Sequence, residues 1–211
     1  MLKETLTLLA LLICFNLSFA ESKPIKVGMV TDVGGVNDQS FNQSAWEGLQ
    51  KAKKELGIKA SYQESKQDAD YASNLETLYE GQNELIWGIG FKMADSLLKA
   101  AKQNPKQKYA IIDYSFGDKT PPNVVGVMFK AEEGAFIAGY IAAKSSKTNA
   151  IGFIGGMSVP IIHAFQYGYK AGAKFANPKV TVLEQYSESF TDAAKGKAIA
   201  NGMMGKNADV V

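Results

Sequence analysis

The chain has 211 residues, with 23 basic and 21 acidic side chains and a formal net charge of +2. Every basic residue is a lysine, so the sequence offers no guanidinium group for bidentate recognition of phosphate, carboxylate or guanine. A charge this small does not provide the basic surface of a nucleic-acid-binding protein. One His and one Cys are too few for a zinc site, a Ser–His–Asp triad or a Cys–His pair. The composition therefore predicts no nucleic-acid partner, no metal site and no such catalytic group, and nothing in it requires a cofactor.

The first 20 residues have the pattern of a signal peptide. An apolar run over residues 6–19 follows a short start that carries a lysine, and a small-residue cleavage site ends at Ala20. The run is shorter than the ~20 residues of a membrane span, which favours a cleaved signal peptide over an uncleaved anchor. Lipidation at Cys14 is disfavoured because Ile13, not a small residue, precedes it. We expect an exported protein that is periplasmic or associated with the cell envelope.

Short β-rich runs alternate with amphipathic helical stretches along the rest of the chain. This alternation predicts α/β architecture, in which parallel strands are joined by right-handed crossovers with helices on both faces of the sheet. The predicted strands are Ile25–Val30, Ala60–Glu64, Leu85–Ile89, Tyr109–Asp113, Val124–Phe129, Ala150–Ile154 and Val180–Tyr186. The predicted helices are Phe41–Leu56, Ala69–Gln82, Met93–Gln103, Ala131–Ser145, Pro160–Phe175 and Asp192–Gly205.

The sequence predicts two lobes after the signal peptide. The stretch AIGFIGGMSVP, which starts at Ala150, resembles KVGMVTDVGGVND near the start of the chain, as if a second strand–loop–helix unit begins there. We therefore expect an N-terminal α/β lobe over residues 21–130, followed by a crossover helix and a second α/β lobe over residues 131–211. The second lobe is expected to be truncated, because Asp209–Val211 has the pattern of another buried strand and a free apolar edge is normally avoided.

Two local patterns predict helix starts and core positions. Ser40 followed by Gln43 fits a capping box for the helix from Phe41, and Asp192 is expected to cap the last helix. Four aromatic residues of the second half are expected in the core: Phe129, Phe136, Tyr140 and Phe153.

Ligands of an open α/β sheet bind beyond the carboxyl ends of its strands, and this rule selects the loop after the first strand. Two glycines allow this loop to turn tightly, and Asp32, Asn37 and Asp38 surround the start of the following helix. Phe41 lies in the first helical turn, where it could form a flat face for a stacked ring. The alternative for Phe41 is packing as a hydrophobic staple or between the lobes.

The same rule selects the ends of three further strands, one of them at Gly155-Gly156-Met157 in the second lobe. Asp113 ends the fourth strand, where it could face a ligand or merely cap a turn. Gly90 and Phe91 follow the third strand, but Gly88-x-Gly90 is not a dinucleotide fingerprint, since the third glycine is missing. Here the backbone is expected to approach a ligand or a neighbouring strand closely.

Four stretches together resemble the basic membrane protein family, a group of substrate-binding components of ABC importers. The stretches are GMVTDVGGVNDQSFNQSAWEGLQKA, GIGFKMADSL, FKAEEGAFIAGYIAA and IGFIGGMSVPIIHAFQYGYKAGAKFANP. The resemblance runs from about residue 25 to the end of the chain. It implies a type I periplasmic-binding-protein fold, with two doubly wound parallel-sheet lobes and a ligand in the cleft between them. Family members are mostly lipoproteins and are longer, by roughly a third of their length.

The resemblance also implies which residues meet the ligand and what the ligand is. Asp32, Asn37 and Phe41 would belong to a purine-nucleoside pocket, Asp113 would reach it from a neighbouring strand, and Gly90 with Phe91 would line it. The expected protein is a monomer without enzyme activity that delivers the nucleoside to an ABC permease in the membrane. One alternative is a sugar- or autoinducer-binding protein of the same fold. Another is an exported nucleoside hydrolase that acts through Asp32 or Asp113.

Overall fold

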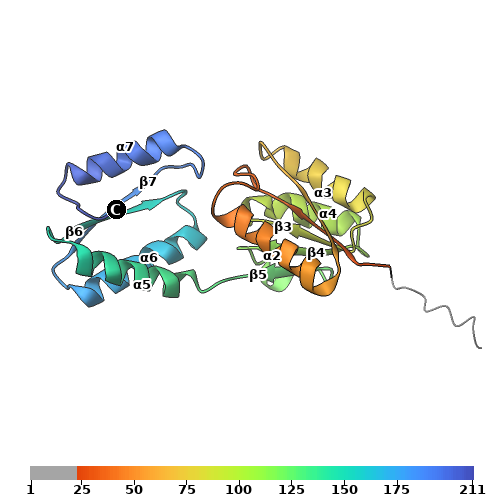
Figure 1. Cartoon of the computed structure of the whole chain (residues 1–211), viewed down its shortest axis with the longest axis horizontal. Helices are drawn as coiled ribbons and strands as arrows, with labels where there is room; N and C mark the ends of the chain where they lie inside the picture. The colour runs from red at the N-terminus through yellow and green to blue at the C-terminus, as the bar shows by residue number, and fades with distance from the viewer. Residues whose placement is uncertain (1–22) are drawn as a thin grey trace, which may run out of the picture.

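The computed structural model describes residues 23–211 and arranges them in two α/β lobes (Figure 1). The predicted signal peptide and the lipidation considered at Cys14 lie outside the described residues. Among the helices that the structure describes, none combines the length and the apolar character needed to cross a bilayer.

The first lobe contains one five-stranded sheet in which every neighbouring pair is parallel. Its strand order is β2-β1-β3-β4-β5, which is the doubly wound arrangement that the strand–helix alternation predicts. The strands are β1 Lys26–Val30, β2 Lys59–Gln63, β3 Leu85–Gly88, β4 Lys108–Ile112 and β5 Val124–Val127. The helices are α2 Phe41–Leu56, α3 Asp70–Glu80 and α4 Ala94–Gln103, with short 3₁₀ turns η1 Phe91–Met93 and η2 Gly117–Lys119.

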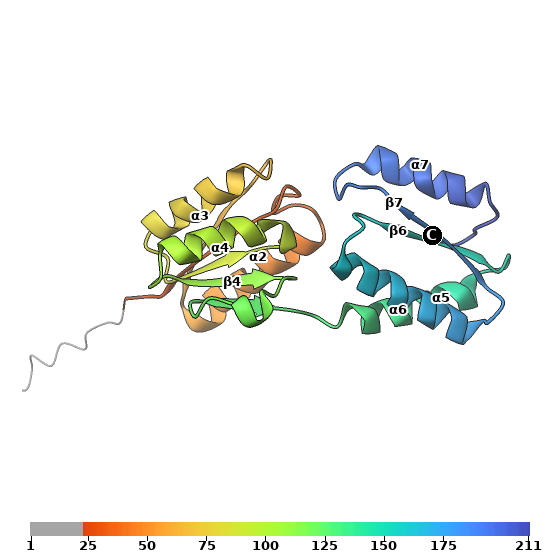
Figure 2. The same cartoon turned by 180° about the vertical axis from the view of Figure 1, so that it is seen from behind.

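Helices cover both faces of this sheet because consecutive strand residues point to opposite sides. On β3, Ile86 is buried with Leu75 of α3 and Leu97 of α4, whereas Trp87 packs with α2 on the other face. Figures 1 and 2, which view the molecule from opposite sides, place α2 and α4 on opposite faces of the sheet. The lobe therefore has two hydrophobic layers, one on each side of the strands.

The second lobe contains a two-stranded parallel sheet with α5 and α6 on one face and α7 on the other (Figure 1). A parallel bridge joins Val210 to Ile151 at the edge of β6 that β7 leaves free, so this lobe repeats the β2-β1-β3 order of the first. The elements are α5 Ala131–Ser145, β6 Ala150–Gly155, α6 Pro160–Ala176, β7 Thr181–Tyr186 and α7 Ala193–Met204.

Helices α5 and α6 touch through their backbones. A Cβ at Gly139 of α5 would overlap the carbonyl of Tyr169, and one at Gly172 of α6 would overlap the carbonyl of Phe136. Small residues line the α5 side of this contact, which we call the α5–α6 seam: Ala131, Ala135, Gly139, Ala142 and Ala143. The missing side chains let the two helices approach more closely than ordinary ridges and grooves allow.

Two of the four aromatic residues expected in the core are exposed. Phe129, which precedes α5, is 60% exposed. Tyr140 is 37% exposed and lies on the same face of α5 as the exposed residues Ile137 and Ile141. The prediction was wrong for Phe129, which lies in the connection between β5 and α5. It was also wrong for Tyr140, whose ring lies 6.3 Å from that of Phe175 on α6 but stays exposed because Phe175 is itself 75% exposed. Phe136 and Phe153 are partly buried, and Phe136 packs against Phe175.

Candidate functional site

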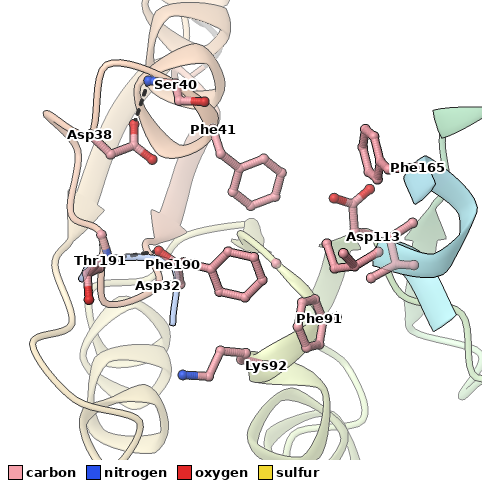
Figure 3. A pocket seen from close by; sticks show the side chains of 14 residues that line it. Asp32, Asp38, Ser40, Phe41, Phe91, Lys92, Asp113, Phe165, Phe190 and Thr191 are labelled. Carbon is pink, nitrogen blue, oxygen red and sulfur yellow. Dashed lines mark hydrogen bonds between the residues drawn. The ribbon is translucent and has the colours of Figure 1, made fainter. Parts of the chain in front are cut away.

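A cavity of about 540 Å³ lies between the lobes, where the carboxyl ends of both sheets meet. Its volume falls within the range of about 300–1,000 Å³ that is usual for small-molecule sites. Figure 3 shows aromatic rings from both lobes and carboxylates from the first lobe around this space. The lining residues are Asp32, Gly34, Asp38, Ser40, Phe41, Gly90, Phe91, Lys92 and Asp113 from the first lobe, and Ile161, Ile162, Phe165, Phe190 and Thr191 from the second.

The loop between β1 and α2 is held by a buried amide. Asn42 is 1% exposed; its Nδ2 donates to Asp32 Oδ1 at 2.7 Å and to Asp38 Oδ2 at 3.0 Å. The Asn42 Oδ1 accepts from the backbone N–H of Asp32 at 3.2 Å, and Gly34 donates its N–H to Asp32 Oδ1 at 2.9 Å. These bonds leave Asp32 Oδ2 free of protein donors among the described residues. Asp32 is therefore fixed in place with one oxygen available to a ligand.

Asp38, not Ser40, caps α2. Its carboxylate accepts from the backbone N–H groups of Ser40 at 3.0 Å, Asn42 at 2.9 Å and Gln43 at 3.1 Å, whereas the Ser40 side chain makes no capping bond. The capping box predicted at Ser40 and Gln43 was wrong because a carboxylate two residues earlier reaches the same N–H groups. Burial works against the charge of Asp38, but these hydrogen bonds outweigh it and lower the pKa of the carboxyl.

Phe41 lies at the cavity wall and also packs into the core of the first lobe. Its ring is partly buried against Met29, Val36 and Ile89, and it also lines the cavity. Gly90 has φ +105°, and a Cβ there would lie 3.3 Å from the Phe41 ring. The absence of that Cβ lets the Phe41 ring and the Gly90 backbone lie together at the cavity wall.

Asp113 lies immediately after β4 with a left-handed backbone, at φ +62°. Its N–H donates to the carbonyl of Val127 at 2.9 Å, which fixes the position of the residue. Its carboxylate lines the cavity and accepts no hydrogen bond from the described residues. Burial raises the pKa of this carboxyl, because nothing nearby offsets the loss of hydration. Asp113 thus presents two free acceptor oxygens to the cavity.

The second lobe supplies an apolar wall that sequence reasoning missed. Ile161, Ile162 and Phe165 come from the first turns of α6, and Phe190 with Thr191 comes from the loop after β7. The carboxyl-end rule, applied to the strand ending at Tyr186, would have selected this loop. The sequence predicts only a helix cap in this loop, at Asp192. That prediction is confirmed, because Asp192 Oδ1 accepts from the backbone N–H of Lys195 at 2.8 Å.

Phe190 is fixed by contacts in both lobes. It packs on Gly156, where any Cβ would overlap its ring. Its ring also meets Phe91 edge to face, with centroids 6.1 Å apart and an interplanar angle of 71°. Phe91 lines the cavity, and through Phe190 it also contacts the opposite lobe.

The structure brings five of the six predicted site residues together at the cavity: Asp32, Phe41, Gly90, Phe91 and Asp113. Asn37 is exposed and does not line the cavity, whereas the neighbouring Asp38 does. Within residues 23–211, no group of three or more His, Cys, Asp and Glu side chains has the arrangement of a metal site.

The arrangement favours a flat, donor-rich molecule. Phe41, Phe91, Phe165 and Phe190 offer aromatic surface, and Asp32 with Asp113 offers free carboxylate oxygens. Aromatic rings favour stacked or edge-on ring partners, and carboxylates accept hydrogen bonds from hydroxyl and N–H groups. Two parallel-sheet lobes that meet at such a cavity define a type I periplasmic binding protein.

The comparisons with known proteins identify the family. Residues 25–211 match the Bmp family model, described as ABC transporter substrate-binding protein PnrA-like, and the chain belongs to this family. It is 46% identical over 187 residues to basic membrane protein A of Borreliella burgdorferi, covering 88% of this chain and 55% of that one. It is 46% identical over 191 residues to the ABC transporter nucleoside-binding protein BmpA of Lactococcus lactis, covering 89% of this chain and 54% of that one.

The solved structures agree on the fold. An ABC transporter solute-binding protein from Aeropyrum pernix K1 superimposes with a TM-score of 0.78 at 32% identity, over 88% of this chain and 53% of that chain. A solute-binding protein from Burkholderia multivorans, at 19% identity and TM-score 0.65, has the same fold. The chain spans about half the length of the curated relatives that it matches.

Proposed function

We propose that the protein binds a purine nucleoside in the cavity between its lobes and delivers it to an ABC permease. The observation that carries this proposal is the combination of four phenylalanine rings, the free Oδ2 of Asp32 and the unpartnered carboxylate of Asp113 around a cavity of about 540 Å³. A purine provides a ring to stack, and its N–H groups and the ribose hydroxyls provide donors for the carboxylates. The nucleoside-binding name of the Lactococcus lactis relative supports the same ligand class.

Phe41 and Phe190 have the central roles in this proposal. They come from different lobes, and both rings project into the cavity (Figure 3). A base stacked on them would contribute roughly 1–3 kcal/mol per aromatic contact. Asp32 Oδ2 and the Asp113 carboxylate would accept hydrogen bonds from the ligand, which fixes its orientation. Movement of the lobes about the linker Met128–Lys130 would then remove the ligand from water.

The remaining parts of the proposal concern place and partners. We expect a monomeric, exported protein at the cell envelope, where a permease receives the ligand. Transport of this kind changes no bond in the nucleoside, so no residue of the cavity is assigned a catalytic role.

Isothermal titration of the full chain with inosine and with ribose tests the proposal. We expect inosine to bind and ribose to bind at least about 100-fold more weakly, because ribose lacks the ring that the phenylalanines recognise. Comparable ribose binding would indicate a sugar-binding protein instead. Chromatography of the inosine sample after overnight incubation provides the second readout, since free hypoxanthine would show a nucleoside hydrolase.

A further inference from the structure

Lys92 is the one cationic side chain among the described residues that line the cavity. Its Nζ lies 2.7 Å from Asp68 Oδ1, and its side chain is only 22% exposed. Figure 3 shows the ammonium group directed away from Asp113. The lysine therefore borders the cavity while its charge is engaged elsewhere.

Asp68 is held in this position from the core of the first lobe. The hydroxyl of Tyr71, a residue that is 1% exposed, donates to the same Asp68 Oδ1 at 2.9 Å. Slight burial disfavours the charge of Asp68, but the hydrogen bonds from Lys92 and Tyr71 outweigh it and lower the pKa of the carboxyl. Asp68 therefore stays ionised at neutral pH and remains paired with the ammonium group of Lys92.

The other charges at the cavity are all negative. Asp32, Asp38 and Asp113 line it, and the hydrogen bonds of Asp38 are all made to its own loop and helix. With Lys92 paired to Asp68, the described residues that line the cavity offer a ligand free acceptors and carboxylate charge but no free cation. A phosphate group in the cavity would meet repulsion with no compensating ion pair.

We propose that the Asp68–Lys92 ion pair makes the cavity selective for unphosphorylated ligands. Asp68 is the positioning residue, because its pairing with Lys92 prevents the ammonium group from binding a phosphate. This selectivity rests on the proposed function and deepens it, since it separates nucleosides from nucleotides. Without Asp68, the ammonium group is free to turn toward the cavity and offset part of the carboxylate charge.

The test compares inosine with inosine 5′-monophosphate in the full chain by isothermal titration. We expect the wild type to prefer inosine by about 100-fold or more. Asp68→Asn removes the charge but keeps an acceptor for Tyr71, and it should improve monophosphate binding about tenfold while inosine binding changes less than about twofold. The gain in affinity for the monophosphate should be smaller in high salt, because it depends on the attraction between Lys92 and the phosphate.

Two control variants isolate the role of Lys92. Glu84→Gln makes the same change in net charge at an exposed position where β3 begins, and it should leave the preference unchanged. The double variant Asp68→Asn/Lys92→Gln should lose the gain. If Asp68→Asn does not fold, as judged by near-ultraviolet circular dichroism, Asp68→Ser provides the same comparison.

The outcomes separate the two proposals. A wild type that does not bind inosine overturns the proposed function and the selectivity with it. Normal inosine binding combined with an unchanged preference in a folded Asp68→Asn variant overturns the selectivity alone. A gain that persists in the double variant also overturns it, because Lys92 would then not be the cation responsible.

Discussion

The two lobes begin alike and differ in how much they bury. After its crossover helix α5, the second lobe follows the same order as the first: a strand, a helix, a second strand and a second helix, before the chain returns to the free edge of the first strand. Ten of the twelve largest fully buried side chains belong to the first lobe, and only Ile151 and Val180 belong to the second. The shared topology places ligand residues at equivalent strand ends, but burial is concentrated on one side of the cavity.

The second lobe depends more on backbone contact than on large side chains. Its main buried cluster consists of Ala142, Ala143, Ile151, Ala173 and Val180, next to the α5–α6 seam. The exposed face of α5, with Ile137, Tyr140 and Ile141, adds nothing to that cluster. The two lobes should therefore respond differently to mutation. Both tryptophans, Trp46 and Trp87, lie in the first lobe, so their fluorescence reports on that lobe alone.

The largest effect is expected from truncating the core of the first lobe. Leu97 is fully buried between α4 and the sheet, so Leu97→Ala should cost about 2–5 kcal/mol through lost contacts and a cavity. Urea unfolding followed by tryptophan fluorescence should show a lower midpoint. Hydrogen exchange in α5 and α6 should change little. Equal losses in both lobes would show that they unfold as one unit.

A smaller loss, confined to the second lobe, is expected from Gly172→Ala. The added methyl group would overlap the carbonyl of Phe136, and overpacking of this kind costs about 1–3 kcal/mol. Hydrogen exchange in α5 and α6 should accelerate while the tryptophan transition stays in place. The matched control is Gly134→Ala, on the open side of α5, which should be neutral or stabilising by up to about 1 kcal/mol.

The aromatic walls sharpen the comparison at the cavity itself. Phe41→Ala and Phe190→Ala should each weaken inosine binding by about ten- to a hundredfold through lost stacking. Phe41→Ala should also lower the stability of the first lobe, because its ring packs on Met29 and Ile89. Phe190 is 47% exposed, so Phe190→Ala should lower stability less than Phe41→Ala does, although the contacts with Gly156 and Phe91 are lost. Unaltered inosine affinity in either variant would assign that ring to packing alone.

The smallest effects concern Asp113. Asp113→Asn keeps one acceptor and should weaken inosine binding by about tenfold, less than Asp113→Ala does. Burial raises the pKa of this carboxyl above its ordinary value of 3.8, so its protonated form is favoured in the folded state. The associated stability is present below pH 3.8 and is lost as the pH rises through the folded-state pKa.

The upward shift of the Asp113 pKa provides a second test of this residue. The asparagine variant cannot ionise, so its stability relative to the wild type should increase as the pH rises above 3.8 toward neutrality. Melting curves across this range would check it. A stability difference that is independent of pH would mean that Asp113 ionises in the folded state without a free-energy cost.

The periodic part of the sequence predicted the fold closely, because amphipathic helices and short strands carry their own signal. The bounds of α2, Phe41–Leu56, agree with the prediction, and β7 differs from it by one residue at its start. The pattern could not show that Phe175, which Tyr140 contacts on α6, is itself exposed, and the prediction of Tyr140 in the core was therefore wrong.

The individual site residues were predicted on one side only, although the carboxyl-end rule also selected the strand end at Gly155-Gly156-Met157 of the second lobe. The carboxyl-end rule and the family resemblance identified Asp32, Phe41 and Asp113, all from the first lobe. Phe190 was missed because its loop carries no glycine pair or clustered acids, and its role depends on packing across the cleft against Phe91. Such a contact depends on how the lobes are oriented, and local sequence patterns do not encode that orientation.

The α5–α6 seam gives the second lobe a mechanical property. Helix α5 begins directly after the linker Met128–Lys130, and the carbonyl of Glu132 lies where a Cβ of Gly168 would be. Gly168 is three residues from Phe165, which forms part of the cavity wall. Because backbone rests on backbone along this route, no flexible side chain can absorb a displacement. We therefore expect α5, α6 and this part of the cavity wall to move together as one rigid unit when the chain rotates at the linker.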